Sequence, residues 1–166
     1  MSERKRKQTF DIDELFDINF LTFLECGAKI NFLQTEYMNK CFICSFANGL
    51  FNANKSLYPS LENLKTQILS MFIDMYPEDA NKLIDTETHI NFLHDIANKY
   101  NTNLYIFNEN GTLGYIYETP CNSPLSIMIY NKNEHYQLIL PSNPDSVFDH
   151  EFIGDILSYH SKKQKN

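Results

Sequence analysis

Residues 39–51 read NKCFICSFANGLF, and the spacing of their apolar side chains predicts a helix that begins at Cys41. Apolar residues recur every three to four positions, from Ile43 through Phe46 to Leu50. That period is typical of a helix with one buried face. Asn39 can cap the first turn, and the polar residues 52–54 can end the helix. The stretch therefore predicts a buried helix with a cysteine at its N-terminus.

Three further helices are predicted around this stretch. Ser60 can cap one whose apolar stripe runs to Met75 and which Pro77 closes. A second begins at residue 85 or 86 and carries apolar residues on one side as far as Tyr100. A third has apolar residues at helical spacing before Gly27. The predicted ranges are 61–75, 85–100 and 11–24.

Beyond residue 100 the apolar period changes from helical to alternating, which predicts strands. Asn110-Gly111 favours a hairpin turn, and the polar residues 131–134 favour a second one. The predicted strands span 103–107, 113–117, 125–130 and 135–140, and a last short helix or strand spans 152–159. Helices followed by a sheet predict an α+β fold.

The length of 166 residues fits one domain, and a 43% hydrophobic composition can supply its core. Basic residues cluster at both ends of the chain. We therefore expect a single domain at residues 10–160, between a flexible basic N-terminal tail at 1–9 and a flexible basic C-terminal tail at 161–166. Nothing in the sequence demands an oligomer, so we expect a monomer.

The charge distribution excludes some partners and favours others. Between the tails lie 7 basic and 20 acidic residues, a balance that repels phosphate backbones and favours basic partners. No nucleic acid is therefore expected. Neither a long apolar segment nor a secretory signal is present, so we expect no membrane association and a cytoplasmic location. In that reducing compartment the four cysteines are expected to be free thiols.

Cys41 and His135 are the residues best suited to chemistry. The amides and dipole of a helix N-terminus favour a thiolate at Cys41. His135 follows a polar turn and begins a strand, where an imidazole can act as a general base. Alternation along that strand puts Gln137 on the same face as His135 and Tyr136 on the other. A buried structural cysteine and a solvated histidine remain open as alternatives.

Two other uses of the cysteines have less support. Cys41-Phe-Ile-Cys44 is a C-x-x-C pair, which can serve redox chemistry, but no proline-containing turn separates the two thiols. A zinc site would need a second closely spaced pair of ligands, and the remaining cysteines and histidines are scattered. We therefore expect no metal and no cofactor.

The segments around Cys41 and His135 resemble the ovarian tumour (OTU) family of cysteine deubiquitinases. Residues 39–45 resemble the family's nucleophile box, and residues 127–136 resemble its terminal histidine box. The helix at 86–100 and the strand at 103–107 are similar to the elements between them. The resemblance covers roughly residues 37–140 and implies an OTU-type, papain-like fold with helices around a small, mostly antiparallel sheet.

The resemblance also implies roles for individual residues. Cys41 would attack the carbonyl of ubiquitin's C-terminal glycine, and His135 would activate it as the base. Backbone amides of Cys41 and of the loop Met38 to Lys40 would meet the oxyanion. The implied partners are ubiquitin, polyubiquitin chains or a ubiquitin-like modifier, whose basic tail suits the acidic residues near the motif loops (Glu36, Glu109, Glu118 and Glu134).

The chain departs from the family pattern at two places. Met38-Asn39-Lys40 stands where the family commonly has Asp-Gly-Asn, and Gln137 stands where it commonly has Asn or Asp. Gln137 or Asn39 is then the expected orienter of His135. Two functions stay open: a thiol-dependent deubiquitinase, and a catalytically weak or inactive ubiquitin-binding module. A viral protein or bacterial effector acting in the host cytosol fits either one.

Overall fold

The computed structural model describes residues 21–109, 113–119 and 125–141, which contain strands, three α-helices and two short 3-10 helices. The helices are α2 (Cys41–Ala53), α3 (Leu61–Met75) and α4 (Ile90–Lys99), with 3-10 helices η2 (Lys55–Leu57) and η3 (Pro77–Asp79). The strands are β1 (Leu21–Leu24), β2 (Ile30–Phe32), β3 (Thr35–Tyr37), β4 (Asn103–Asn108), β5 (Leu113–Tyr117), β6 (Ser126–Lys132) and β7 (His135–Pro141).

Five strands form a mixed sheet in the order β1-β7-β6-β4-β5. β4 and β6 run parallel, whereas the other neighbours in this sheet are antiparallel. β2 and β3 form a separate hairpin. The predicted α+β class is therefore confirmed, and the sheet mixes parallel with antiparallel pairs.

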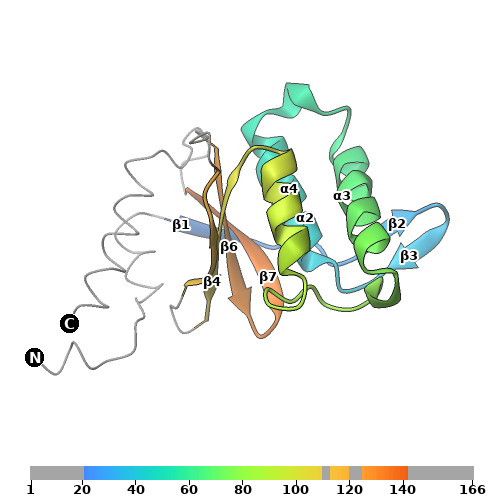
Figure 1. The fold of residues 1–166 in the computed structure, drawn as a ribbon. Coiled ribbons are helices and arrows are strands. Elements are labelled where there is room, and N and C mark those ends of the chain that lie inside the picture. The colour runs from blue at the N-terminus through green and yellow to red at the C-terminus, as the bar shows by residue number, and fades with distance from the viewer. Residues whose placement is uncertain (1–20, 110–112, 120–124, 142–166) are drawn as a thin grey trace, which may run out of the picture.

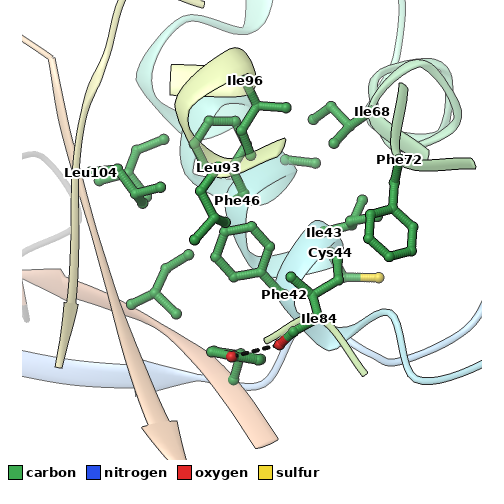
Figure 2. Packing of buried hydrophobic residues seen from close by; sticks show 14 of the residues in the cluster. Phe42, Ile43, Cys44, Phe46, Ile68, Phe72, Ile84, Leu93, Ile96 and Leu104 are labelled. Atoms are coloured by element: carbon green, nitrogen blue, oxygen red, sulfur yellow. Dashed lines mark hydrogen bonds between the residues drawn. The ribbon is translucent and has the colours of Figure 1, made fainter. Parts of the chain in front are cut away.

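The labelled helices lie on one side of the sheet, with α2 against β6 and β7 and with α3 on α2 (Figure 1). Their apolar faces meet in one core, in which Phe46 of α2 lies near Leu93 of α4 (Figure 2). Phe72 of α3 stacks edge-on against Phe92 of α4, with ring centroids 5.1 Å apart. This layer holds the N-terminus of α2 against the sheet.

The predicted helices at the centre of the chain are confirmed. α2 begins at Cys41, and α3 begins after Ser60, whose hydroxyl accepts a hydrogen bond from the Asn63 amide at 3.0 Å. α4 begins at Ile90, later than predicted, because the preceding turn has its own bonds. In it His89 Nδ1 accepts from the Asp85 amide, and the His89 amide donates to the Asp85 carbonyl.

The predicted helix at 11–24 is wrong for its last four residues. Leu21–Leu24 form β1, which pairs antiparallel with β7, from Leu21 opposite Pro141 to Leu24 opposite Leu138. Pairing with a sheet edge outweighed the helical spacing, because these residues include a threonine and a phenylalanine that suit a strand. Residues 11–20, the two tails, the turn at 110–111 and the element at 152–159 lie outside the described residues.

The β2–β3 hairpin was not predicted. Leu33 and Gln34 connect its strands with φ of 49° and 65°, a turn in which both central residues are left-handed. Glycine, asparagine and aspartate usually mark such turns, and this one contains none of them. The hairpin delivers the chain to residues 38–40, directly before Cys41. Within the described residues no helix is long and apolar enough to cross a membrane.

Candidate active site

Cys41 is the first residue of α2 and lies against the turn that joins β6 to β7. Its sulfur accepts a hydrogen bond from the Tyr136 amide at 3.3 Å and lies 4.0 Å from the Glu134 carbonyl oxygen. Both contacts come from the residues that flank His135. The structure therefore brings the two predicted catalytic segments together, although 93 to 95 residues separate them in sequence.

The surroundings of Cys41 have opposing effects on the pKa of its thiol. Burial raises the pKa of the thiol, and the Glu25 carboxylate adds to that effect. The backbone amides of Tyr136, Phe42 and Cys41 itself lower the pKa because they donate toward the sulfur. The net direction is upward. A thiol in this state needs a base to remove its proton as it attacks.

His135 has a carboxylate partner that was not predicted. Its Nε2 forms a hydrogen bond with Glu25 Oε2, and Gln137 Nε2 donates to the other oxygen, Oε1, at 3.2 Å. A carboxylate accepts, so Nε2 carries the proton and the lone pair is on Nδ1. Glu25 therefore fixes the neutral imidazole in the tautomer that has its lone pair on Nδ1.

The two predicted orienters have other positions. Gln137 shares the His135 face of β7, as predicted, but it contacts Glu25 and thereby orients the carboxylate. Asn39 lies away from the imidazole: its side-chain amide donates to the Asn81 carbonyl at 2.8 Å. Its φ of 60° is a left-handed conformation that asparagine tolerates well. Asn39 thus shapes the loop before Cys41.

The amides of Met38 and Lys40 are already engaged. Met38 donates to Asn81 Oδ1 at 2.9 Å, and Lys40 donates to the Ala28 carbonyl at 2.8 Å. For these two amides to meet an oxyanion, those bonds would have to break. The amides of Cys41 and Phe42 lie in the first turn of α2 and lower the pKa of the thiol. They are the better placed donors for a negative charge beside Cys41.

A correct assignment of β1 would have revealed Glu25 from the sequence. Once Leu21–Leu24 is a strand beside β7, the next residue falls near His135 and Gln137. The sequence Leu21-Thr-Phe-Leu24 was instead included in the predicted helix at 11–24, and Glu25 was left in the connection after it. The missed signal is an acidic residue directly after an edge strand.

The other cysteines and histidines in the described residues are buried or bonded in ways that indicate a structural role. Cys26, Cys41 and Cys44 are free thiols. Cys44 is fully buried, and burial raises its pKa to about 11, which makes it a poor redox partner. His89 Nε2 pairs with Asp79 at 2.9 Å, and His94 Nδ1 bonds the Tyr115 hydroxyl at 2.8 Å. No group of three metal-ligating side chains occurs among the residues described.

A scan against protein-family models and searches of the curated proteins and of the solved structures find no match to this chain.

Proposed function

We propose that this protein is a thiol-dependent deubiquitinase that hydrolyses ubiquitin or ubiquitin-like conjugates. The observation that carries the proposal is the arrangement around Cys41. The residues on both sides of His135 contact the Cys41 sulfur, and the imidazole is held by Glu25. A nucleophile, a base and a carboxylate orienter form the constellation used for acyl transfer.

Each step of the proposed hydrolysis can be assigned to a group at the candidate site. His135 Nδ1 accepts the thiol proton while Sγ attacks the carbonyl carbon of the conjugate. The first-turn amides of α2 stabilise the negative oxygen that forms. His135 then donates the proton to the leaving lysine amine, and the C–N bond breaks to give a thioester. Water, deprotonated by His135, hydrolyses the thioester and returns the free thiol.

Glu25 would act through charge as well as orientation. Proton uptake converts His135 to imidazolium, and a neighbouring carboxylate stabilises that cation. A glutamine in the same place could accept the hydrogen bond but would lack the full charge. The weakness implied by Gln137 at the family's Asn or Asp position is therefore relieved by Glu25.

An OTU-type, papain-like fold is part of the proposal. Its support is the buried helix that begins at the nucleophile and packs on β7, the strand that begins at the histidine. The acidic excess between the tails suits the basic tail of ubiquitin. Action on ubiquitin in the host cytosol, as a viral protein or bacterial effector, goes with this proposal.

A non-cleaving ubiquitin-binding module is the second candidate, and the burial of Cys41 favours it. Only 2% of Cys41 is exposed, and burial raises its pKa. A substrate carbonyl would reach the sulfur only after the covering backbone at Glu134 moved. Binding of ubiquitin without hydrolysis would leave this cover in place.

Hydrolysis of a fluorogenic amide at the C-terminal glycine of ubiquitin separates the two functions. We expect turnover by the unaltered protein, none by Cys41→Ala or His135→Ala, and nearly normal turnover by Cys44→Ala, the matched buried cysteine. Ubiquitin binding in a titration without turnover would favour the binding module. Absence of both binding and turnover would overturn the proposal.

A further inference from the structure

Lys40, the residue before the proposed nucleophile, is buried with 0% of its surface exposed. Its Nζ donates to the Lys82 carbonyl at 2.6 Å and lies 5.0 Å from the centroid of the Phe72 ring. Burial of an ammonium group is costly even when it has partners. A methionine of similar length could fill the same space without that cost. The ammonium therefore calls for a functional reason.

Three consecutive residues of the loop that precedes Cys41 each donate a hydrogen bond to residues 81–82. The Met38 amide donates to Asn81 Oδ1, the Asn39 side chain donates to the Asn81 carbonyl, and Lys40 donates to the Lys82 carbonyl. Lys40 is the buried member of this set, whereas Asn81 and Lys82 are exposed. The position of the α2 N-terminus thus depends on residues 81–82.

The same segment also holds the histidine strand. The Tyr136 hydroxyl donates to the Ile84 carbonyl at 2.7 Å, and Tyr136 follows His135 directly. We call residues 79–89 the bracing segment. Asp79 and Asp85 near its ends both bond His89, the N-cap residue of α4. The bracing segment, which has hydrogen bonds of its own, therefore contacts both the loop before Cys41 and the strand that begins at His135.

We propose that Lys40 is a positioning residue for Cys41, whose buried ammonium clamps the nucleophile loop to the bracing segment. The proposal rests on the proposed function, because it assumes that Cys41 is the nucleophile. The clamp keeps the Cys41 sulfur within reach of the Tyr136 amide, which the same bracing segment holds. Without it, the first turn would move away from the bracing segment, and the thiolate would lose the Tyr136 amide as a donor.

The charged groups around the Lys40 ammonium are consistent with this role. Cys41 on α2 and Asp79 on η3 favour the protonated amine, and burial among Phe72 and its neighbours opposes it. Lys82 Nζ and His89 both pair with Asp79, which reduces the negative charge available to Lys40. The pKa of Lys40 is lowered to about 8, so the amine remains largely charged at pH 7.

Alkylation of Cys41 by iodoacetamide tests the proposal without ubiquitin. The rate would be followed from pH 6 to pH 10 by mass spectrometry of the Cys41 peptide, for the full chain and for Lys40→Met. Lys99→Met is the matched control, since Lys99 Nζ also lies over a ring, at 5.8 Å from that of Tyr100. Urea unfolding at pH 7 would be measured on the same proteins.

We expect Lys40→Met to be at least as stable as the unaltered protein and yet to alkylate about tenfold more slowly, the effect of one lost charged hydrogen bond. The midpoint of its pH profile should move to higher pH, and Lys99→Met should behave normally. An unchanged rate and midpoint, or slow alkylation accompanied by lost stability, would overturn the proposal.

A second variant covers the case in which Lys40→Met does not fold. Asn81→Ala changes an exposed residue and removes the acceptor of the Met38 amide, so it should fold and slow alkylation about threefold. A normal rate for Asn81→Ala would then overturn the clamp. Failure of the proposed function has a different signature: alkylation would respond to Lys40 while the protein showed no turnover of ubiquitin conjugates.

Discussion

Glu25 accepts a hydrogen bond from His135 Nε2 across 110 residues of sequence, directly after β1 ends beside β7. The antiparallel pairing of β1 with β7 makes this contact, because Leu24 lies opposite Leu138 and Glu25 follows in register. A short edge strand thus supplies the carboxylate of the candidate site. Substitution of Glu25 can therefore test how the imidazole of His135 is oriented.

Substitution of Glu25 should separate charge from orientation. We expect Glu25→Ala to lower kcat about 10²-fold and Glu25→Gln about 10-fold, since the amide can still accept from Nε2–H but cannot stabilise imidazolium. Gln137→Ala should cost only a few-fold, because Gln137 acts through Glu25. Steady-state kinetics on a ubiquitin amide measures all three. Equal losses of kcat for Gln137→Ala and Glu25→Ala would contradict the view that Gln137 acts only through Glu25.

Lys40→Met should change the pH dependence of stability. The pKa of Lys40 is lowered from 10.5 to about 8, so the unfolded chain binds more protons than the folded protein between these values. The unaltered protein should therefore gain stability relative to Lys40→Met as pH rises from 8 to 10.5. The full effect is about 3 kcal/mol.

Urea unfolding of the two proteins at pH 7 and pH 10.5 measures this difference. Lys40→Met should have its greatest advantage at pH 7 and lose most of it at pH 10.5. A stability difference that did not change with pH would show that the Lys40 amine keeps an ordinary pKa in the fold.

Glu134→Gly should stabilise the turn beside Cys41. Asn133 and Glu134 have φ of 53° and 65°, and a left-handed conformation costs a residue such as glutamate about 1 kcal/mol. Asn-Gly is the preferred pair for such a turn. Leu33→Gly, in the similar turn of the β2–β3 hairpin, is the matched control and should stabilise equally.

Kinetics distinguishes the two glycine variants. If the Glu134 carboxylate helps to bind the basic tail of ubiquitin, only Glu134→Gly should raise KM, by a few-fold. Thermal unfolding of both variants measures whether each glycine stabilises its turn. A lower Tm for Glu134→Gly would mean that the glutamate side chain stabilises the turn more than its φ costs.

Asn39 should tolerate glycine better than alanine. Both variants lose the hydrogen bond to the Asn81 carbonyl, but only alanine is strained at a φ of 60°. We expect Asn39→Gly to cost about 1 kcal/mol and Asn39→Ala about 1 kcal/mol more. Urea unfolding of the pair measures the difference. Equal stabilities would indicate that the loop relaxes to another conformation.

The central helices could be predicted because local signals agree with the tertiary structure. The apolar period from Ile43 to Leu50 matches the buried face of α2, and Ser60 caps α3 as its sequence position indicates. Cys41 and His135 were identified for the same reason. Each lies at the first residue of an element, as predicted. The predicted Asn39 cap of α2 is wrong, because Lys40 is the N-cap residue and the Asn39 side chain bonds the Asn81 carbonyl instead.

The parts that escaped prediction depend on distant pairing. Leu21–Leu24 carries a helical apolar spacing, and only its partner β7 makes it a strand. The sequences of β4 and β6 likewise contain no local signal for their parallel pairing. Glu25 could not be assigned without the first of these, and Lys40 appears in the sequence as an ordinary surface lysine. Its burial follows from the contacts of α2 with α3 and the bracing segment.

Covalent capture by ubiquitin with an electrophile at its C-terminus tests whether Cys41 is the nucleophile of a deubiquitinase. Intact-mass spectrometry would compare the unaltered protein with Cys41→Ala, Cys44→Ala and His135→Ala. We predict one added ubiquitin on the unaltered protein and on Cys44→Ala, slower addition on His135→Ala and none on Cys41→Ala. An adduct that persists in Cys41→Ala, or no adduct on the unaltered protein, would contradict the assignment of Cys41 as the nucleophile of a deubiquitinase.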